Sequence, residues 1–467
     1  MRSASLLLAA LATGSLAASV GARLLQSRGV GPRVVRLDMH RDPTDPIRNH
    51  LLRKRKETVQ ASLDNLDTLY AINASVGTPS QNVRLHLDTG SSDLWVNTES
   101  SAFCSSEGNP CTVGGTYDPN SSSTASLINE RFNISYVDGS GASGDYVSDT
   151  FRLGSTDIPN FQFGVGAESS TQRGILGIGY ASNEAQVLRN NDAPYDNLPL
   201  KLVKGGHIRS AAYSIYLNDL DARTGTILFG GVDVAHYEGD LSALPIQSEG
   251  GVYRRFLVTL TSLKFGDETV DKDMALGVVL DSGSSITYLP ADVVGALYEI
   301  VGATYVQDQD LAFVPCSART DSRTLSFAFS GSAAIEVPMD ELVLDLSSVT
   351  GRRAAFNNGQ DACLFGIAPA PENITNVLGD TFMRSAYVVF DLENNEISLA
   401  QAKLNSTETD VREIGTGSDA VPGAKKVDNP VAAKFGLTEG GQSGAGPAAS
   451  VSAAAAVACM AALLVMF

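Results

Sequence analysis

The sequence predicts an all-β protein of two related lobes, and two observations carry this prediction. From about residue 66 to 402, short apolar runs alternate with Gly, Asn, Asp and Ser turns, at the spacing seen in sandwiches and barrels. A triplet of Asp, Thr or Ser, and Gly also occurs twice, at Asp88 and at Asp281. Such a duplication predicts two lobes facing each other about a pseudo-two-fold axis, which would bring Asp88 and Asp281 together.

The strand pattern is clear in several short segments, and helical patterns are few. Val83 to Leu87, Phe132 to Tyr136, Tyr213 to Leu217 and Tyr387 to Phe390 have strand length and strand composition. The best helical pattern is residues 292–301, just after Pro290. A second echo supports the duplication, because Gly174-Ile-Leu-Gly and Asn376-Val-Leu-Gly follow the two copies of the Asp motif.

The net charge of −18 argues against a nucleic-acid partner, because phosphate binding needs a basic surface. Two interpretations of the acidity stay open: solubility in an acidic medium, or a field that attracts cations.

The N-terminal residues indicate secretion. Met1-Arg2, an apolar run and small residues ending near Ala18 have the layout of a signal peptide, here 1–18. A basic segment, 19–55, ends at Lys54-Arg55 and is expected to be a pro-peptide; the alternative is a solvated charge run. The N-terminal lobe is then expected at 56–236 and the C-terminal lobe at 237–402. Five Asn-x-Ser/Thr sequons fit a secreted chain: Asn73, Asn120, Asn133, Asn373 and Asn405.

The composition changes after residue 402. Residues 403–443 are rich in Ser, Thr, Gly, Ala and Asp, which predicts a flexible stalk. Small residues, a short polar spacer and the apolar segment 451–467 are typical of a signal for lipid-anchor addition, here 444–467. Ser443 is the preferred attachment residue, with Gly440 and Gly441 as close rivals. The alternative is a weak transmembrane helix, for which the segment is rich in Ala and marginal in length. We therefore expect the chain at the cell surface, held to the membrane through a lipid anchor.

The cysteines predict two disulfides. Cys459 lies in the apolar tail, and an oxidising compartment favours pairing of the other four, which allow three connectivities. We expect Cys104–Cys111 and Cys316–Cys363, because each closes a loop within its own half. A zinc site is the rival, although no Cys-x-x-Cys pair or clustered His accompanies these residues.

The repeated triplet is the candidate catalytic site. One Asp-Thr-Gly is a weak signal, because any turn can supply it. Two copies, each after an apolar run, predict two partly desolvated carboxylates, Asp88 and Asp281, which would be costly to bury unless paired or protonated. Hydroxyls could join the two loops or bond the carboxylates, and glycines allow tight turns. The supporting residues are Thr89, Gly90, Ser91, Ser282, Gly283 and Ser284.

These motifs closely resemble the two active-site motifs of pepsin-like aspartic proteases. Asp88-Thr-Gly-Ser-Ser-Asp-Leu-Trp-Val and Asp281-Ser-Gly-Ser-Ser-Ile-Thr-Tyr-Leu-Pro carry the resemblance, which covers roughly residues 66 to 402. The signal, the dibasic junction and the tail look most like the fungal cell-surface members, the yapsin-like and candidapepsin-like enzymes. The resemblance implies the bilobal pepsin-like fold, with an active-site cleft between the two β lobes. It also implies a monomeric endopeptidase acting on protein or peptide substrates, with no cofactor or metal.

The pair also predicts a mechanism. Two carboxylates held close cannot both ionise easily, so they share one proton at acidic pH. The ionised partner would activate a water and the protonated partner would donate to the peptide carbonyl oxygen. The resemblance implies that Asp88 carries the proton and Asp281 acts as the base.

A flap is the next element that the resemblance implies. Residues 134–140 are similar to the hairpin that closes over substrate in the family, with Tyr136 as the flap tyrosine and Trp95 as its indole partner. Asp138, two residues beyond Tyr136, would then face the pocket for the side chain before the cut bond and could favour Lys or Arg. The alternative for Asp138 is an ordinary turn residue in Asp-Gly.

Two other functions remain in competition. A pepsin-like fold without catalysis could serve as a binding or inhibitor protein of the cell wall, although such a chain would be expected to lose one Asp or its Gly. A glycosidase also uses two carboxylates, but it needs no duplicated motif.

Overall fold

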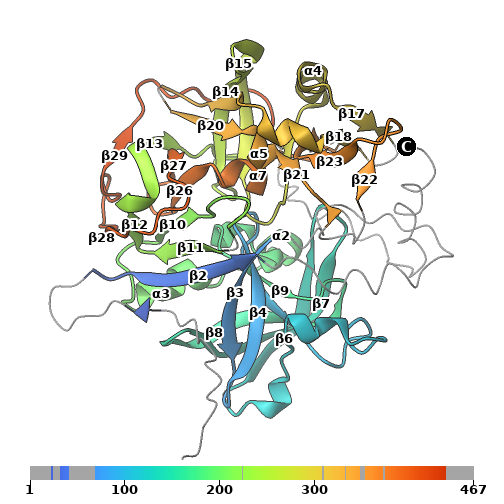
Figure 1. Ribbon diagram of the computed structural model, residues 1–467. Coiled ribbons are helices and arrows are strands. Elements are labelled where there is room, and N and C mark those ends of the chain that lie inside the picture. The colour runs from blue at the N-terminus through green and yellow to red at the C-terminus, as the bar shows by residue number, and fades with distance from the viewer. Residues whose placement is uncertain are drawn as a thin grey trace, which may run out of the picture.

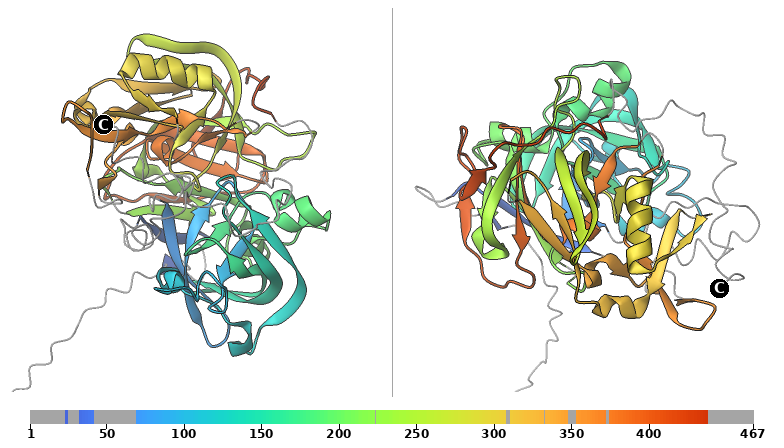
Figure 2. Two further views of the ribbon diagram at one scale, coloured as in Figure 1. Left: turned by 90° about the vertical axis from the view of Figure 1, so that its right-hand side faces the viewer. Right: turned by 90° about the horizontal axis from the view of Figure 1, so that it is seen from above.

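The computed structural model describes residues 23–24, 32–41, 69–222, 224–307, 310–331, 333–347, 353–371 and 374–437. Figure 1 shows two β-rich lobes, the N-terminal one below in blue to green and the C-terminal one above in yellow to orange. Two further views show the same two bodies joined by a layer of strands (Figure 2). The predicted two-lobed, all-β architecture is therefore confirmed.

Among the described residues, the largest sheet has 15 strands and runs from the N-terminal lobe into the layer between the lobes. Its order is β29-β13-β27-β26-β10-β11-β2-β3-β4-β9-β5-β8-β7-β6, with β1 paired to β2. The bounds are β1 Arg23–Leu24, β2 Val35–Arg41, β3 Tyr70–Val76, β4 Gln81–Asp88, β5 Leu94–Asn97, β6 Ser126–Ser135, β7 Gly141–Leu153, β8 Thr156–Ser169, β9 Gly174–Gly177, β10 Ala212–Tyr216, β11 Thr224–Phe229, β13 Tyr237–Pro245, β26 Ala386–Asp391, β27 Glu396–Ala402 and β29 Ala424–Lys426.

The C-terminal lobe adds a seven-stranded and a five-stranded sheet within the described part of the chain. The first has strands β14 Leu257–Phe265, β15 Glu268–Leu280, β16 Thr287–Leu289, β19 Thr324–Ala328, β20 Ala334–Pro338, β24 Ile367–Pro369 and β25 Asn376–Leu378. The second has β17 Thr304–Val306, β18 Leu311–Pro315, β21 Val343–Leu344, β22 Ala354–Ala355 and β23 Asp361–Phe365. A separate pair joins β12 Gly231–Asp233 to β28 Val411–Glu413.

The two lobes repeat one arrangement around the Asp motifs. In the N-terminal lobe, β4 pairs in parallel with β9, and β9 pairs antiparallel with β5. In the C-terminal lobe, β15 pairs in parallel with β25, and β25 pairs antiparallel with β16. The repeated segments beginning at Gly174 and Asn376 thus form β9 and β25, the strands that pair with β4 and β15. An internal duplication requires this equivalence.

The helices are short, and α4 (Ala291–Val301) is the longest of those described. It begins after Pro290 and ends where Gly302 has a φ of +67°, a conformation that glycine adopts without strain. This matches the predicted helix over 292–301. The others are α2 Ala185–Asn190, α3 Leu198–Lys204, α5 Met339–Leu342 and α7 Asp380–Met383. In the described residues, none of these helices is long and apolar enough to cross a membrane.

Strand β2, which falls in the expected pro-peptide, is built into the middle of the large sheet. It pairs antiparallel with β11 over six residues and with β3 through His40 and Arg41. Val35, Leu37 and Met39 on its inner face are buried in the main hydrophobic core. The N-terminal segment is thus part of the folded body in this state of the chain.

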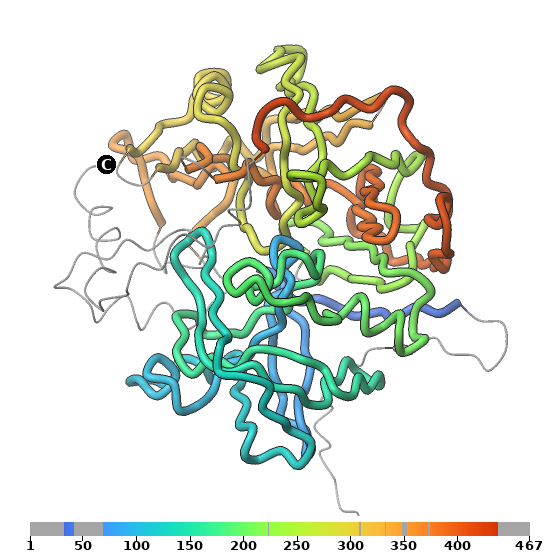
Figure 3. The backbone as a smooth tube through the Cα atoms, turned by 180° about the vertical axis from the view of Figure 1, so that it is seen from behind, coloured from blue at the N-terminus to red at the C-terminus, as the bar shows by residue number. Residues whose placement is uncertain are grey.

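The predicted flexible stalk is wrong for residues 403–437, which fold onto the body. Strand β28 pairs with β12 and β29 pairs in parallel with β13. Figure 3 shows this segment in red along the outer surface of the C-terminal lobe. Ile414 is fully buried and Val421 nearly so, in a small core that includes Tyr387. Few apolar residues suffice here because the existing sheet supplies backbone partners for the segment.

Candidate active site

The first motif forms a loop at the end of β4, and its carboxylate is tightly held. Asp88 is the last residue of β4 and only 6% exposed. The backbone N–H of Gly90 donates to Asp88 Oδ1 at 2.8 Å, and the Ser91 hydroxyl donates to Asp88 Oδ2. The carboxylate therefore keeps one orientation, with both oxygens bonded by its own loop.

The second motif repeats this geometry directly after β15. The backbone N–H of Gly283 donates to Asp281 Oδ1 at 2.8 Å, and the Ser284 hydroxyl donates to Asp281 Oδ2 at 2.8 Å. Asp281 is partly exposed, whereas Asp88 is buried. The two loops thus have one hydrogen-bond pattern but different access to solvent.

Reciprocal hydrogen bonds join the two loops. The Thr89 hydroxyl donates to the Leu280 carbonyl at 2.9 Å and accepts from the Ser282 N–H at 3.0 Å. The Ser282 hydroxyl donates to the Leu87 carbonyl at 2.9 Å and accepts from the Thr89 N–H at 3.2 Å. All four bonds are buried, so each is sheltered from competition with water. The lobes are therefore locked together at the site.

The glycines of the motifs bring the carboxylates face to face. A Cβ on Gly90 would lie 2.7 Å from Asp281 Oδ1, and a Cβ on Gly283 would lie 2.5 Å from Asp88 Oδ1. Both distances are too short for real Cβ contacts. Each glycine is therefore required by the carboxylate of the opposite loop.

The site favours a shared proton. Burial, and after it the charge of Asp281, raises the pKa of Asp88 from 3.8 to about 8. Hydrogen bonds from Ser91 and Gly90 oppose this shift without cancelling it. A buried carboxyl with an ionisable neighbour holds its proton into the range where an isolated Asp is ionised. The arrangement can thus supply an acid and a base side by side.

The expected flap is the β6–β7 hairpin, with its turn at residues 136–140. The indole N–H of Trp95 donates to the Tyr136 hydroxyl at 2.8 Å. Burial, and after it the Asp88 charge, raises the pKa of Tyr136 well above its usual value. Asp138 Oδ1 accepts from the Ser140 N–H at 2.8 Å, a bond typical of an Asx turn. Val137, at the tip, is 52% exposed.

Sequence reasoning missed a buried acid group behind the first loop. Asp93, in the same motif run, accepts hydrogen bonds from the hydroxyls of Tyr146 at 2.9 Å and Tyr195 at 3.0 Å, and from the Ala185 N–H at 2.7 Å. Burial raises its pKa. Glu184 is also buried, and desolvation raises its pKa from 4.5 to about 10. The partners lie far along the chain, so no local spacing reveals the cluster.

The predicted disulfides are confirmed. Cys104 pairs with Cys111 and Cys316 with Cys363, with Cα–Cα distances of 5.1 and 4.9 Å. Within the described ranges, no group of three or more His, Cys, Asp or Glu is placed to hold a metal ion.

The sequons that the structure describes lie on the surface. Their exposed asparagines are Asn73, Asn120, Asn133 and Asn405. The fifth sequon, Asn373, lies outside the described residues. So do the predicted cleavage residues Lys54 and Arg55 and the predicted anchor residue Ser443.

Comparison with known proteins gives a consistent result. The family described as "Eukaryotic aspartyl protease" matches residues 69–402. The chain is 50% identical over 408 residues to "Probable aspartic-type endopeptidase opsB" of Aspergillus oryzae, covering 86% of this chain and 82% of that protein. It is 38% identical over 357 residues to "Secreted aspartic protease 3" of Candida albicans, covering 75% of this chain and 83% of that protein.

A solved structure agrees in fold. The aspartic proteinase from Irpex lacteus superposes with a TM-score of 0.59 at 20% sequence identity, covering 73% of this chain and 96% of that one.

Proposed function

Since the chain belongs to the eukaryotic aspartyl protease family and is a pepsin-like aspartic endopeptidase, we propose that Asp88 and Asp281 are its catalytic residues. The observation that carries this assignment is the pair of interlocked loops, in which each motif glycine faces the carboxylate of the other lobe. Mutually facing carboxylates are the arrangement that peptide hydrolysis by an activated water needs.

The asymmetry of the site supports a division of roles. Asp88, whose raised pKa reflects burial, keeps the proton, and the more exposed Asp281 acts as the base. Asp281 takes a proton from the attacking water while Asp88 donates its proton to the peptide carbonyl oxygen, which gives a gem-diol. Asp281 then protonates the leaving nitrogen, the C–N bond breaks, and a hydroxyl proton of the gem-diol returns to Asp88. No covalent link between enzyme and substrate forms.

Inhibition tests this proposal against the two other functions. We expect pepstatin to abolish casein cleavage at acidic pH with one inhibitor bound per chain. Casein cleavage that persists with pepstatin bound would contradict the assignment, and a chain that cuts no protein at any acidic pH would favour the binding or inhibitor function.

We further propose that Tyr136 closes over substrate and that Asp138 favours Lys or Arg before the cut bond. The hydrogen bond from Trp95 to Tyr136 supports the first part, because it fixes the tyrosine side chain at the turn of the hairpin. The Asp138 carboxylate also accepts a hydrogen bond from the Ser140 N–H and so stabilises the turn. The effect of its charge must therefore be tested separately from its effect on the turn.

The matched variants are Asp138→Asn, which keeps an oxygen for Ser140 and removes the charge, and Asp138→Ala, which removes both. If the charge selects substrate, both variants lower kcat/KM for peptides with Lys or Arg before the cut more than for peptides with Leu or Phe. Equal losses of kcat/KM on both peptide sets, or a loss in Asp138→Ala alone, would contradict a role of the Asp138 charge in specificity.

The chain is also proposed to be a secreted precursor that matures by cleavage after Lys54-Arg55 and is tethered near Ser443 by a lipid anchor. The printed name of the Candida relative, a secreted protease, supports the secretory part. The composition of residues 444–467 supports the anchor. We also expect the enzyme to act as a monomer.

Treating intact cells with a phosphatidylinositol-specific phospholipase tests the tether. Release of the activity into the medium is expected. Activity that stays on the cells, on a chain that still carries Phe467, would contradict the anchor.

A further inference from the structure

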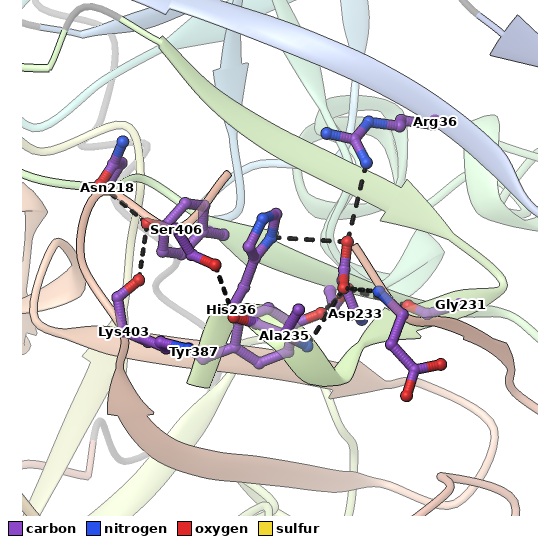
Figure 4. A network of polar contacts seen from close by, with 12 residues as sticks. Arg36, Asn218, Gly231, Asp233, Ala235, His236, Tyr387, Lys403 and Ser406 are labelled. Atoms are coloured by element: carbon purple, nitrogen blue, oxygen red, sulfur yellow. Dashed lines mark hydrogen bonds and ion pairs between the residues drawn. The ribbon is translucent and has the colours of Figure 1, made fainter. Parts of the chain in front are cut away.

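A buried carboxylate, Asp233, joins three segments that are far apart in the sequence (Figure 4). Its Oδ1 accepts from the N–H of Asp410, in the C-terminal segment, at 2.7 Å and from the N–H of Ala235 at 3.2 Å. Its Oδ2 faces two cationic or potentially cationic groups: Arg36 Nη1 at 3.7 Å and His236 Nδ1 at 3.7 Å. The Asp233 side chain is 0% exposed.

Arg36 belongs to β2, the strand of the expected pro-peptide. The guanidinium also lies 3.6 Å from Asp38 on the same strand. Nearby, the Arg33 N–H donates to Glu413 Oε1 at 3.1 Å. The ion pair with Asp233 thus links β2 to β12, the partner of the C-terminal strand β28, and its Asp233 side is buried.

His236 stands beside the same oxygen but has no hydrogen bond to it. Its side chain is 5% exposed, and the ring stacks on Tyr216 with centroids 4.4 Å apart. Both His236 Nδ1 and Asp233 Oδ2 lack a hydrogen-bond partner among the described residues. Burial and the charge of Arg36 lower the pKa of His236, while the charge of Asp233 opposes them.

Neighbouring titratable and charged groups make bonds of their own, among them Tyr216, whose hydroxyl donates to Asn218 Oδ1 and the Lys403 carbonyl. Lys403 contacts His236 through its backbone N–H, and Asp410 pairs with Arg412 at 2.8 Å. The Tyr387 hydroxyl accepts from the Asp233 N–H and donates to Ser214. The Asp233 carboxylate is therefore the natural partner for a proton on His236.

We propose that His236 is an acid-sensing group that loosens the pro-peptide strand by competing with Arg36 for Asp233 Oδ2. The protonated imidazole of His236 and the guanidinium of Arg36 would compete for Asp233 Oδ2, and the two cations would repel each other. His236 is only three residues from Asp233 in the chain and cannot move away from it. Arg36 and its strand β2 are therefore displaced. This inference rests on the proposed pro-peptide assignment of residues 19–55 and gives that segment a release trigger.

Thermodynamic linkage fixes the sign. Because Arg36 lowers the pKa of His236, proton binding must weaken the Arg36 contact by the same factor. The strand is held most firmly above the range where His236 titrates, and its hold weakens as the pH falls through that range. One linked proton changes the opening equilibrium of the strand by at most about tenfold per pH unit.

Hydrogen exchange on the full chain measures this opening. The precursor would carry Asp281→Asn to prevent self-cleavage, and exchange of the β2 amides would be followed from pH 7 to pH 5 after correction for intrinsic exchange rates. Amides of β26 serve as the internal reference. We expect β2, but not β26, to open several-fold more at pH 5 than at pH 7.

Three substitutions in this precursor distinguish the His236 mechanism from a nonspecific loss of stability at acidic pH. His236→Gln should flatten the pH dependence of β2 opening between pH 7 and pH 5. Arg36→Gln should open β2 already at pH 7 and raise the pKa of His236, seen in the NMR titration of its ring proton. His207→Gln, at a histidine outside the network, should behave as the parent.

An unchanged pH profile in His236→Gln would overturn the proposal. If His236→Gln fails to fold, a pKa of His236 that is the same in Arg36→Gln as in the parent would overturn it instead. The pro-peptide assignment is tested separately by the mass of the acid-treated wild-type enzyme. If residues 19–55 remain in the active chain, that assignment fails, whatever the exchange data show.

Discussion

The two lobes present the same catalytic loop, yet they bury their acid groups in different ways. In the N-terminal lobe, Asp93 and Glu184 receive hydrogen bonds from neutral donors, the tyrosine hydroxyls and backbone N–H groups described above. In the C-terminal lobe, the buried Glu341 pairs with the buried Arg384. Burial nevertheless raises the pKa of Asp380 well above its usual value, and the charge of Arg384 opposes this shift without cancelling it.

The two lobes thus share the backbone geometry of the site but not its electrostatics. A lobe whose buried acids lack cationic partners must keep them protonated or accept the cost of a buried charge. The N-terminal lobe, with Asp93 and Glu184, is therefore expected to depend on acid more strongly than the C-terminal lobe, where Arg384 offsets part of the cost of burying Asp380. Three experiments test this difference between the lobes.

The largest effect is expected from breaking the symmetry of the loops. Gly283→Ala would place a methyl 2.5 Å from Asp88 Oδ1, and Gly90→Ala would place one 2.7 Å from Asp281 Oδ1. Each should lower kcat/KM by at least about 100-fold, because a displacement near 1 Å in an active site has that cost. Gly295→Ala, in an exposed turn of α4 with open space around it, is the control and should leave kcat/KM unchanged. Full activity in either loop variant would show that the carboxylates are not face to face.

The disulfides differ between the lobes in the length of chain they close. Cys316–Cys363 spans 47 residues and Cys104–Cys111 spans 7. Chain entropy predicts that replacing the first pair by serine lowers the free energy of unfolding by about 4 kcal/mol, and replacing the second by about 2.4 kcal/mol. Urea denaturation at one acidic pH measures both. An equal or reversed order would mean that structure in the unfolded chain, and not loop length, sets the cost.

The third experiment tests the acid dependence of the N-terminal lobe. Burial raises the pKa of Glu184 from 4.5 to about 10. The folded chain therefore binds a proton that the unfolded chain releases above pH 4.5, so stability falls as pH rises, by up to about 1.4 kcal/mol per unit. Glu184→Gln keeps an acceptor for the Tyr195 N–H and removes the titration.

The melting temperature of this variant should thus exceed that of the wild type at pH 7 and not at pH 4. Two parallel curves of melting temperature against pH would contradict a protonated Glu184. Asp340→Asn, at an exposed acid in the C-terminal lobe, is a suitable control.

The catalytic loops could be predicted from the sequence because each copy of the duplicated motif is a short continuous segment, Asp-Thr-Gly or Asp-Ser-Gly, that follows an apolar run. The disulfides followed from a similar local rule. The segment 403–437 could not be predicted, because its strands depend on edges that β12 and β13 offer and not on its own composition. The Arg36–Asp233–His236 contact was equally hidden, since it joins residues about 200 positions apart through the sheet register.

The central claim is that Asp88 and Asp281 act as one catalytic unit. The most direct test is kcat/KM at acidic pH for Asp88→Asn and Asp281→Asn, with circular dichroism to show that the fold is kept. Each single variant is predicted to lose at least about 1,000-fold, within the range for losing a general acid or base, and the double variant little more than either. A folded single variant that retained near wild-type activity would contradict the account.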